Sequence, residues 1–282
     1  MFLIEPFIWM FSVKNFKHHF MYLLLTAAIC WFSTFLLFFF SERLFSFNSL
    51  IINIIVIVSG IFLFLAPFLA LTGYFWCLTD NIIGREQEAK LNSIYSGDKG
   101  LKNIITLPEW DLPRFIWRGI ASIVASIIMY IPFTIIVVLI IFNLSVIAAF
   151  WQLDPMQVTI ATFIIMILMA LLLPGLLWNY ARRDSVVAVL NIPKAIDLLA
   201  NNASRYLLHT ILLIIVYVIS SLITSFLSTI SGFSENMHAL PDATIFTAIK
   251  VIFVLLCCHI INIYFIYVYA YVLGTLVPTN EH

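Results

Sequence analysis

Residues 107–119 are Leu-Pro-Glu-Trp-Asp-Leu-Pro-Arg-Phe-Ile-Trp-Arg-Gly, and they close the one long polar interval of an otherwise apolar chain. Asp111 followed by Pro113 predicts a helix start, because the carboxylate accepts hydrogen bonds from free N–H groups and the first turn does not need the N–H that proline lacks. The tryptophans are typical anchors at a membrane surface, and the arginines are long enough to snorkel to lipid headgroups. We therefore predict that a helix enters a membrane here, with five interface anchors: Trp110, Asp111, Arg114, Trp117 and Arg118.

The composition excludes most soluble folds. Of 282 residues, 63% are hydrophobic and 10% are charged, whereas a soluble domain carries roughly 25% charged residues. The 14 basic and 14 acidic residues cancel, so the net charge does not indicate a nucleic-acid partner. The four cysteines lie inside apolar runs without a CxxC pair, which predicts small buried side chains and neither a disulfide nor a zinc site.

Six uncharged windows each exceed the ~20 residues that cross a ~30 Å hydrocarbon core as a helix. Uninterrupted apolar runs without period-two alternation favour helices over strands, because a segment in lipid must satisfy its own backbone N–H and C=O groups. We predict an all-α membrane protein, a single polytopic domain over 1–282, with six transmembrane helices at about 21–40, 50–78, 119–145, 158–180, 206–230 and 251–277. Bends are expected at Gly60 or Pro67, at Pro132 and at Pro174-Gly175.

The basic residues indicate the orientation. All 14 of them except Arg43 and Lys250 lie before the first span, between spans two and three, or between spans four and five. The positive-inside rule then places both termini, the 79–118 loop and the 182–205 segment in the cytoplasm. We therefore predict a multi-pass protein of the cytoplasmic membrane, in contact with the lipid bilayer and not with nucleic acid.

Three segments outside the spans carry predictions of their own. Residues 1–17 mix large apolar side chains with charged ones, which suits a helix in the headgroup region; the alternative is a longer, tilted first span. The 79–118 loop begins as a helical continuation of span two. The 182–205 segment alternates apolar and polar groups, which predicts one or two short helices on the cytoplasmic surface, broken at Asn191-Ile192-Pro193. Further interface anchors are expected in and beside this segment: Arg182, Arg183 and Arg205.

The odd-numbered spans begin alike. Each start pairs a capping-type residue with a basic group three positions later: Asn15 with His18, Asp111 with Arg114, and Asn202 with Arg205. The pattern predicts three repeats of a unit made of one surface helix and two spans. The alternative is that any helix entering a membrane from the cytoplasm needs a cap and a cation.

The same residues carry a resemblance to a known family. Its elements follow one another as Gly73-Tyr74, Leu107-Pro108-Glu109-Trp110-Asp111 with Gly119, Leu173-Pro174 with Tyr180-Ala181-Arg182, and Ala200-Asn201-Asn202 with Tyr206-Leu207. The chain resembles, over nearly its whole length, the prokaryotic membrane family known as domain of unknown function 4013. The resemblance implies a polytopic prokaryotic membrane protein and implies no catalytic residue. The polar interval before Leu107 is longer than the family's compact Gly-to-Trp spacing.

Polar groups inside the spans are few. The span interiors contain no Asp, Glu, Lys or Arg, the residues that usually mark ion paths and proton relays. His259 lies deep in the last span, and Asn262 lies three positions later on the same helix face. These two predict an intramembrane polar contact, either with a ligand or in an interhelical hydrogen bond worth about 0.6 to 2 kcal/mol, which is the commoner role.

No motif indicates catalysis. The sequence contains no HExxH, GxSxG, P-loop or dinucleotide-binding glycine pattern. Glu109 and Asp111 are the one pair of carboxylates on a predicted face at the membrane surface, but helix capping and pairing with arginine explain both. We therefore expect no catalytic residue, no cofactor and no metal site.

Three functions remain open at this point. The first is a non-enzymatic component of the cytoplasmic membrane that binds lipid, a partner membrane protein or a second copy of itself through 79–118 and 182–205. The second is a transporter or channel for a small molecule or lipid, which the proline and glycine breaks in the spans favour. The weakest is a membrane enzyme acting at the cytoplasmic face through Glu109, Asp111 or the His18-His19 pair.

Overall fold

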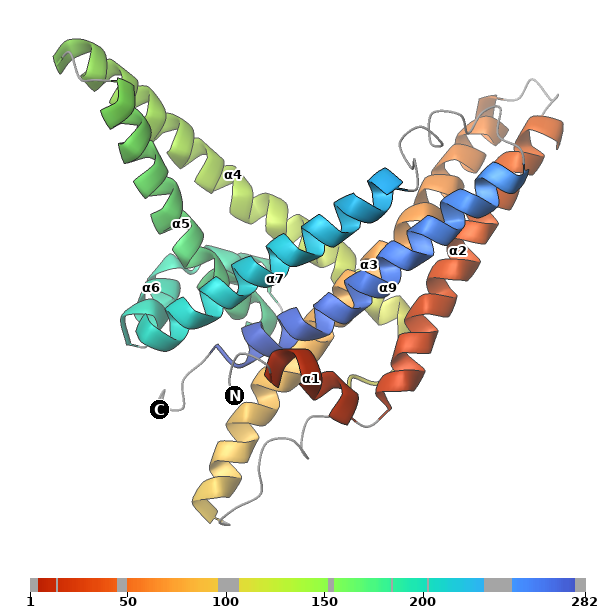
Figure 1. Ribbon diagram of the computed structural model, residues 1–282, viewed down its shortest axis with the longest axis horizontal. Helices are drawn as coiled ribbons and strands as arrows, with labels where there is room; N and C mark the ends of the chain where they lie inside the picture. Colours follow the sequence, from red (N-terminus) through yellow and green to blue (C-terminus); the bar gives the residue numbers. More distant parts are fainter. Residues whose placement is uncertain are drawn as a thin grey trace.

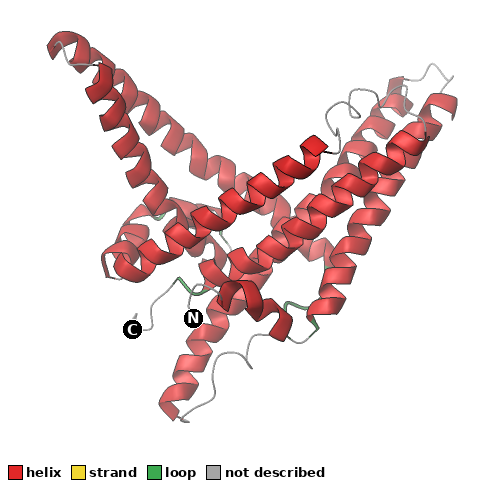
Figure 2. Ribbon diagram, in the orientation of Figure 1, coloured by secondary structure: helices red, strands yellow, loops and turns green. Residues whose placement is uncertain are grey.

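The computed structural model describes residues 5–13, 15–44, 50–95, 107–151, 155–183, 185–201, 203–230 and 245–276. The regular elements of these residues are all helices (Figure 2), so the all-α prediction is confirmed for them. Six helices are long: α2 (Phe16–Leu44), α3 (Leu50–Tyr95), α4 (Leu112–Trp151), α5 (Pro155–Arg183), α7 (Ala203–Ile230) and α9 (Ile245–Gly274). Three are short: α1 (Glu5–Ser12), the 3-10 helix η2 (Val186–Leu190) and α6 (Ile192–Asn201).

Five of the long helices contain segments long and apolar enough to cross a membrane, judged on length and composition within the described residues. These segments are Phe16–Phe40, Asn53–Gly84, Leu112–Met129, Tyr206–Phe226 and Ile249–Gly274. The remaining predicted span, 158–180, lies within α5 but is not among the five, so the count of six spans stays a prediction. At 46 residues, α3 is about 70 Å long, well over the ~30 Å of a hydrocarbon core. Its last turns therefore continue beyond the span, as expected for the start of the 79–118 loop.

The long helices run in alternating directions along the chain (Figure 1). Helices α2, α3 and α9 contact one another as one group, and α7 lies along α9. The hairpin of α4 and α5 diverges from this group, so that the two arms separate towards one end of the molecule. Both termini lie at the opposite end.

Two clusters of buried side chains lie where α5 ends, where α4, α6 and α7 begin, and along the part of α3 that ends at Ile83. One core holds Trp76, Trp178, Tyr180 and Tyr206, and joins α3, α5 and α7. A second core joins α1 and α4 to α3 and α9, and at its centre the hydroxyls of Tyr74 and Tyr267 lie 2.7 Å apart. Packing in these clusters holds the helices together, while the other end of the α4–α5 hairpin diverges.

A pair of glycines allows α3 and α4 to pack backbone against backbone. A Cβ on Gly73 would collide with the carbonyl of Phe115, and a Cβ on Gly119 would collide with the carbonyl of Leu69. The two glycines thus lie in the same helix crossing from opposite sides. Close approach of this kind is what small residues provide between membrane helices.

Helices α3, α4 and α5 contain internal prolines, and in α3 and α5 a neighbouring aromatic side chain bonds the backbone beside the proline. Proline removes an N–H and pushes away the carbonyl of the preceding turn, so the freed groups need other partners. Beside Pro67 in α3, Trp31 Nε1 donates to the carbonyl of Phe64 at 3.1 Å. Beside Pro174 in α5, the Tyr206 hydroxyl accepts from the N–H of Gly175 at 2.8 Å and donates to the carbonyl of Leu172 at 3.4 Å. Both prolines therefore lie in continuous helices.

Replacing Tyr206 with phenylalanine is expected to lower the free energy of unfolding by about 1 to 3 kcal/mol, because a buried N–H loses its acceptor. Tyr217 lies on the same helix but is 67% exposed, so Tyr217→Phe is the matched control. Thermal unfolding in detergent compares the two variants. Equal melting temperatures would show that the Tyr206 hydroxyl does not support α5.

The short elements partly match their predictions. The predicted break at 191–193 is confirmed, since η2 ends at Leu190, α6 begins at Ile192 and Asn191 lies between them. The Asn191 amide oxygen accepts from the N–H of Lys194 at 3.2 Å and so caps α6. Helix α1 lies on α9, where the Trp9 ring contacts those of Tyr267 and Tyr271. Whether α1, η2 and α6 lie in the headgroup region stays a prediction.

The three predicted repeats are not established. Asp111 caps α4, whereas Asn15 adopts a left-handed backbone with φ 68° and uses its carbonyl to accept from the N–H groups of His18 and His19. Asn202, the third counterpart, lies outside the described residues. The two described starts therefore use different geometries for the same sequence pattern.

Candidate functional site

The start of α4 forms as its sequence predicts. Asp111 Oδ1 accepts from the N–H of Arg114 at 3.2 Å, the helix begins at Leu112, and Pro113 lies in its first turn. The carboxylate is exposed and satisfies a backbone donor that the helix itself cannot. The capping role expected of Asp111 is confirmed.

The two tryptophans of this stretch have different surroundings. Trp117 is 73% exposed on α4, which suits an interface anchor. Trp110 is half-buried, and its ring contacts those of His19, Tyr22 and Phe115. Trp110 therefore differs from the expectation of a lipid-facing anchor: it packs α2 against the start of α4, because the chain before α4 folds back over α2.

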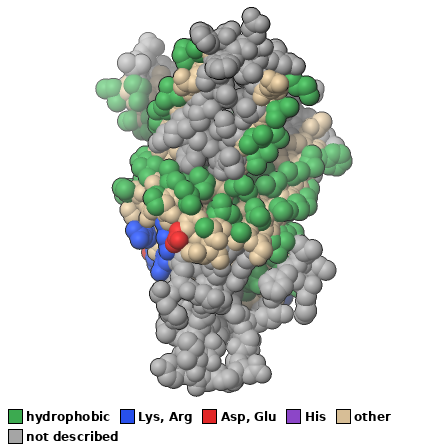
Figure 3. All heavy atoms as spheres, turned by 90° about the vertical axis from the view of Figure 1, so that its left-hand side faces the viewer, with side chains coloured by type: hydrophobic (Ala, Val, Ile, Leu, Met, Phe, Trp, Pro, Cys, Tyr) green, Lys and Arg blue, Asp and Glu red, His purple; other side chains and the backbone are tan. Residues whose placement is uncertain are grey.

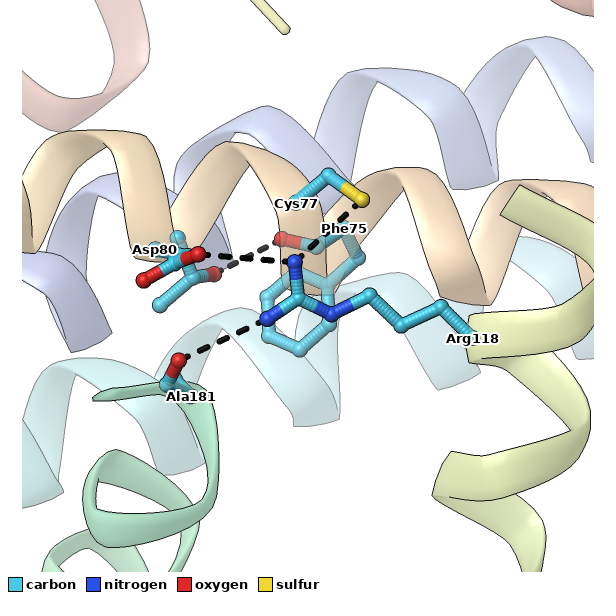
Figure 4. Close-up of polar contacts among 6 residues, drawn as sticks. Phe75, Cys77, Asp80, Arg118 and Ala181 are labelled. Atoms are coloured by element: carbon cyan, nitrogen blue, oxygen red, sulfur yellow. Dashed lines mark hydrogen bonds and ion pairs between the residues drawn. The ribbon is translucent and has the colours of Figure 1, made fainter. Parts of the chain in front are cut away.

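Arg118 lies at the centre of a buried cluster of polar contacts (Figure 4). Its side chain is only 5% exposed. One terminal nitrogen lies 3.5 Å from a carboxylate oxygen of Asp80 and donates to Cys77 Sγ at 3.4 Å. The other donates to the carbonyl of Ala181 at 3.5 Å. One guanidinium thus links α3, α4 and the end of α5.

The sequence places Arg118 there for a local reason. Arg118 directly precedes Gly119, and the glycine crossing brings the backbone of α4 against α3. The side chain next to that crossing has no route to solvent and meets Cys77 and Asp80 on α3. The expectation that Arg118 snorkels to the headgroups is therefore not met, because the neighbouring helix covers it.

The charges of the cluster balance. A buried guanidinium is costly unless it is paired, and Asp80, whose side chain is 40% exposed, supplies the counter-charge at the edge of the protein. Ala181 lies in the last turn of α5, where carbonyls lack intrahelical donors and cations bind favourably. The arrangement is therefore suited to tying three helices together.

The other predicted anchors are at the surface where they are described. Arg114, Arg182 and Arg183 are exposed, and the Arg182 guanidinium carbon lies 5.2 Å from the centre of the Trp178 ring. The side chain of Arg205 lies outside the described part of the structure. Their anchoring role at a membrane stays a prediction.

The predicted intramembrane contact does not contain the expected hydrogen bond. His259 is 1% exposed, and neither ring nitrogen has a hydrogen-bond partner among the described residues. Its neighbours are the rings of Trp31 and Phe68, with centroids at 5.3 and 6.2 Å. Asn262 is half-buried on the same helix. An aromatic enclosure surrounds the imidazole instead, because His259 faces α2 and α3 beside the Pro67 turn.

No group of three or more His, Cys, Asp or Glu side chains that could hold a metal ion occurs among the described residues. Glu109 is exposed, Asp111 caps α4, His18 is exposed, and His19 is buried against Tyr74 and Trp110. His19 therefore contacts Trp110, the residue between Glu109 and Asp111.

The sequence patterns do not single out several residues of this region. They indicate Asp80 only as the end of the second apolar run, yet it is the counter-ion of Arg118. The tyrosine pair Tyr74 and Tyr267 joins α3 to α9 across 193 positions. One sequence signal for the ion pair is available. Asp80 ends one apolar run, and Arg118 lies at the start of the next.

Comparison with curated proteins and with solved structures gives no match. A family model described as "Protein of unknown function (DUF4013)" matches residues 97–229. The match contains Arg118, Gly119, Pro174-Gly175 and Tyr206 but not Gly73 or Asp80, and so covers less of the chain than the resemblance implied. The match over residues 97–229 supports the resemblance of the chain to the DUF4013 family of proteins of unknown function.

Proposed function

We propose that the protein crosses the cytoplasmic membrane six times, with both termini in the cytoplasm, and that it acts without catalysis by binding lipid or partner helices. The sixth crossing is α5, whose 29 residues exceed the ~20 needed for a span. Its antiparallel course beside α4 supports the same count, because α4 and α5 form a hairpin (Figure 1).

The observation that carries this proposal is the position of the described charges. Asp80 lies near the end of the apolar segment of α3, and Arg118, Arg182 and Lys194 lie near the start of α4, in the last turn of α5 and in the first turn of α6. The exceptions are at the opposite ends of α2 and α9, where Glu42, Arg43 and Lys250 lie. Figure 3, seen from the side of α5 and α6, shows basic and acidic side chains together below a band of hydrophobic ones. Such a boundary supports a membrane surface at this level, with the basic side in the cytoplasm.

The α4–α5 hairpin supports a binding role. Its described side chains include a long exposed apolar stripe on α4, and a shallow depression of about 500 Å³ lies along it. Lining residues are Ile123, Ser126, Ile127, Ile131, Thr134 and Ile135. Two hydroxyls within an isoleucine-rich face suit a partner helix, because small polar side chains make interhelical hydrogen bonds in lipid. Lipid tails are the other natural cover for this face.

Purification in mild detergent followed by native mass spectrometry tests the binding role. The expected result is a chain that retains phospholipid, a second copy or another membrane protein. Isolated monomer without any of these would contradict the proposal.

Reporter fusions within 96–106 and 231–244 test the topology, and the proposal requires the first to be cytoplasmic and the second to be exterior.

A transporter is the second candidate, because His259 is a buried ionisable side chain beside the proline-containing turn of α3. If the imidazole has no polar ligand, His259→Leu is expected to raise the free energy of unfolding by about 1 to 3 kcal/mol, since two buried polar atoms are removed. His18→Leu, at an exposed position, is the control. A lower melting temperature for His259→Leu would instead indicate a bound polar ligand and favour transport.

A further inference from the structure

A depression of about 640 Å³ lies where the end of α5 meets η2. It is lined by Arg183, Ser185, Val187, Ala188, Leu190 and Asn191. We propose that this depression binds the headgroup of an anionic phospholipid, with its phosphate on the arginine side. The inference rests on the proposed function and names the lipid class and the place at which it binds.

The first argument is charge. Arg182 and Arg183 are both exposed in the last turn of α5, and Arg182 is steadied by the ring of Trp178 at 5.2 Å. The nearby carboxylate of Asp197 is already engaged, by Lys194 Nζ at 3.7 Å and by Asn201 Nδ2 at 3.0 Å. No described carboxylate forms an ion pair with either arginine. The described surface around the depression is therefore positive.

The second argument is that repulsion between the C-terminus of α5 and an anion is reduced. The C-terminus of a helix carries partial negative charge, which would repel a phosphate. Here the buried Arg118 donates to the carbonyl of Ala181 in that last turn, and so offsets part of this charge from inside the protein. The exposed arginines are then free to face outward.

Polar donors are also present in the lining. Ser185 contributes an exposed hydroxyl. Asn191 uses its amide oxygen to cap α6 at the N–H of Lys194, and no described residue accepts from its side-chain NH2. Headgroup oxygens are hydrogen-bond acceptors, so a hydroxyl and an amide beside a guanidinium match them.

The third argument distinguishes a lipid from a soluble phosphate. Val187, in the lining, is 73% exposed, and Ile196 on α6 is 50% exposed. A free anion would leave these side chains in water. A phospholipid covers them with its glycerol and acyl portion while its phosphate meets the arginines, as on other amphipathic surface segments with a basic side.

The test is native mass spectrometry of the full chain titrated with phosphatidylglycerol or phosphatidylcholine of the same acyl chains. The wild-type protein is expected to bind phosphatidylglycerol preferentially. Arg182→Gln with Arg183→Gln should weaken that binding roughly thirtyfold, as two lost basic groups near a membrane predict. Lys250→Gln, at an exposed lysine outside the depression, should leave it unchanged, and Arg182→Lys with Arg183→Lys should keep most of it.

Several results would overturn the assignment. Unchanged phosphatidylglycerol binding by the double glutamine variant, or an equal loss in Lys250→Gln, would remove the site. Displacement of the lipid by millimolar inorganic phosphate would make the ligand a soluble anion. Loss of a co-purified protein with no change in lipid would make the surface a protein-docking site. If the wild-type chain retains neither lipid nor a partner, the proposed function itself is refuted. If all variants retain lipid equally, only the location of the lipid site is refuted.

Discussion

Leucine in place of Gly119 is expected to prevent the native packing of α3 against α4, and with it the accumulation of folded protein. Even the single Cβ of Gly119→Ala would collide with the carbonyl of Leu69. A backbone atom cannot rotate away as a side chain can, so the two helices must separate. We expect Gly119→Ala to cost about 3 kcal/mol or more, the upper range for overpacking, and Gly119→Leu to leave no folded fraction.

The chain offers both a reciprocal variant and a matched control. Gly73→Ala should destabilise similarly, because its Cβ would collide with the carbonyl of Phe115 from the other side of the same crossing. Gly84 lies on the same helix as Gly73, and a Cβ added there would meet nothing within 4 Å. Gly84→Leu should therefore be neutral or slightly stabilising, since leucine favours helix more than glycine by roughly 1 kcal/mol.

Fluorescence-detected size exclusion and thermal unfolding in detergent measure these effects. A monodisperse peak is expected for the wild type and Gly84→Leu, and aggregation for Gly119→Leu. If Gly119→Ala and Gly84→Ala had the same melting temperature, α3 and α4 would not approach each other through these glycines. The contacts of Arg118 depend on that close approach, so the same result would mean that they do not form.

The helices of this protein could be predicted from its charges because, in lipid, a backbone has few alternatives to a helix. Charged residues bound the apolar windows, and each long helix contains most of one window, although α3 continues past its window to Tyr95. Asp111 and Pro113 predict the start of α4 correctly because a cap depends only on local sequence. Asn191 likewise marks a break that the structure contains, between η2 and α6.

The site could not be predicted in the same way, because burial is decided by the neighbouring helix. Arg118 follows the pattern of a snorkelling residue, and Trp117, one position earlier, is in fact exposed. Neighbouring positions on a helix are about 100° apart, so one of them faces outward and the other faces α3. Gly119 is the one sequence signal that this face of α4 packs against another helix. The signal is weak, because glycines have many roles in membrane helices.

Asp80 and Arg118 give the second large expected effect. Asp80→Asn keeps the shape of the side chain but leaves a buried guanidinium without its counter-charge. Breaking a fully buried pair costs about 3 to 5 kcal/mol, and because Asp80 is 40% exposed we expect a loss of about 2 kcal/mol. Asp111→Asn is the control, since Asp111 is exposed and asparagine caps a helix about as well as aspartate.

Arg118→Met should cost less than Asp80→Asn, although it removes the bonds to Cys77 and Ala181. It takes the charge out of the protein interior, fills the same channel with an apolar side chain, and leaves behind a carboxylate that water can reach. The double variant should then be about as stable as Arg118→Met alone, because the neutral amide of Asp80→Asn no longer faces an uncompensated cation. A double-mutant cycle on unfolding in detergent measures this coupling. Additive single effects would mean that Asp80 and Arg118 do not form an ion pair.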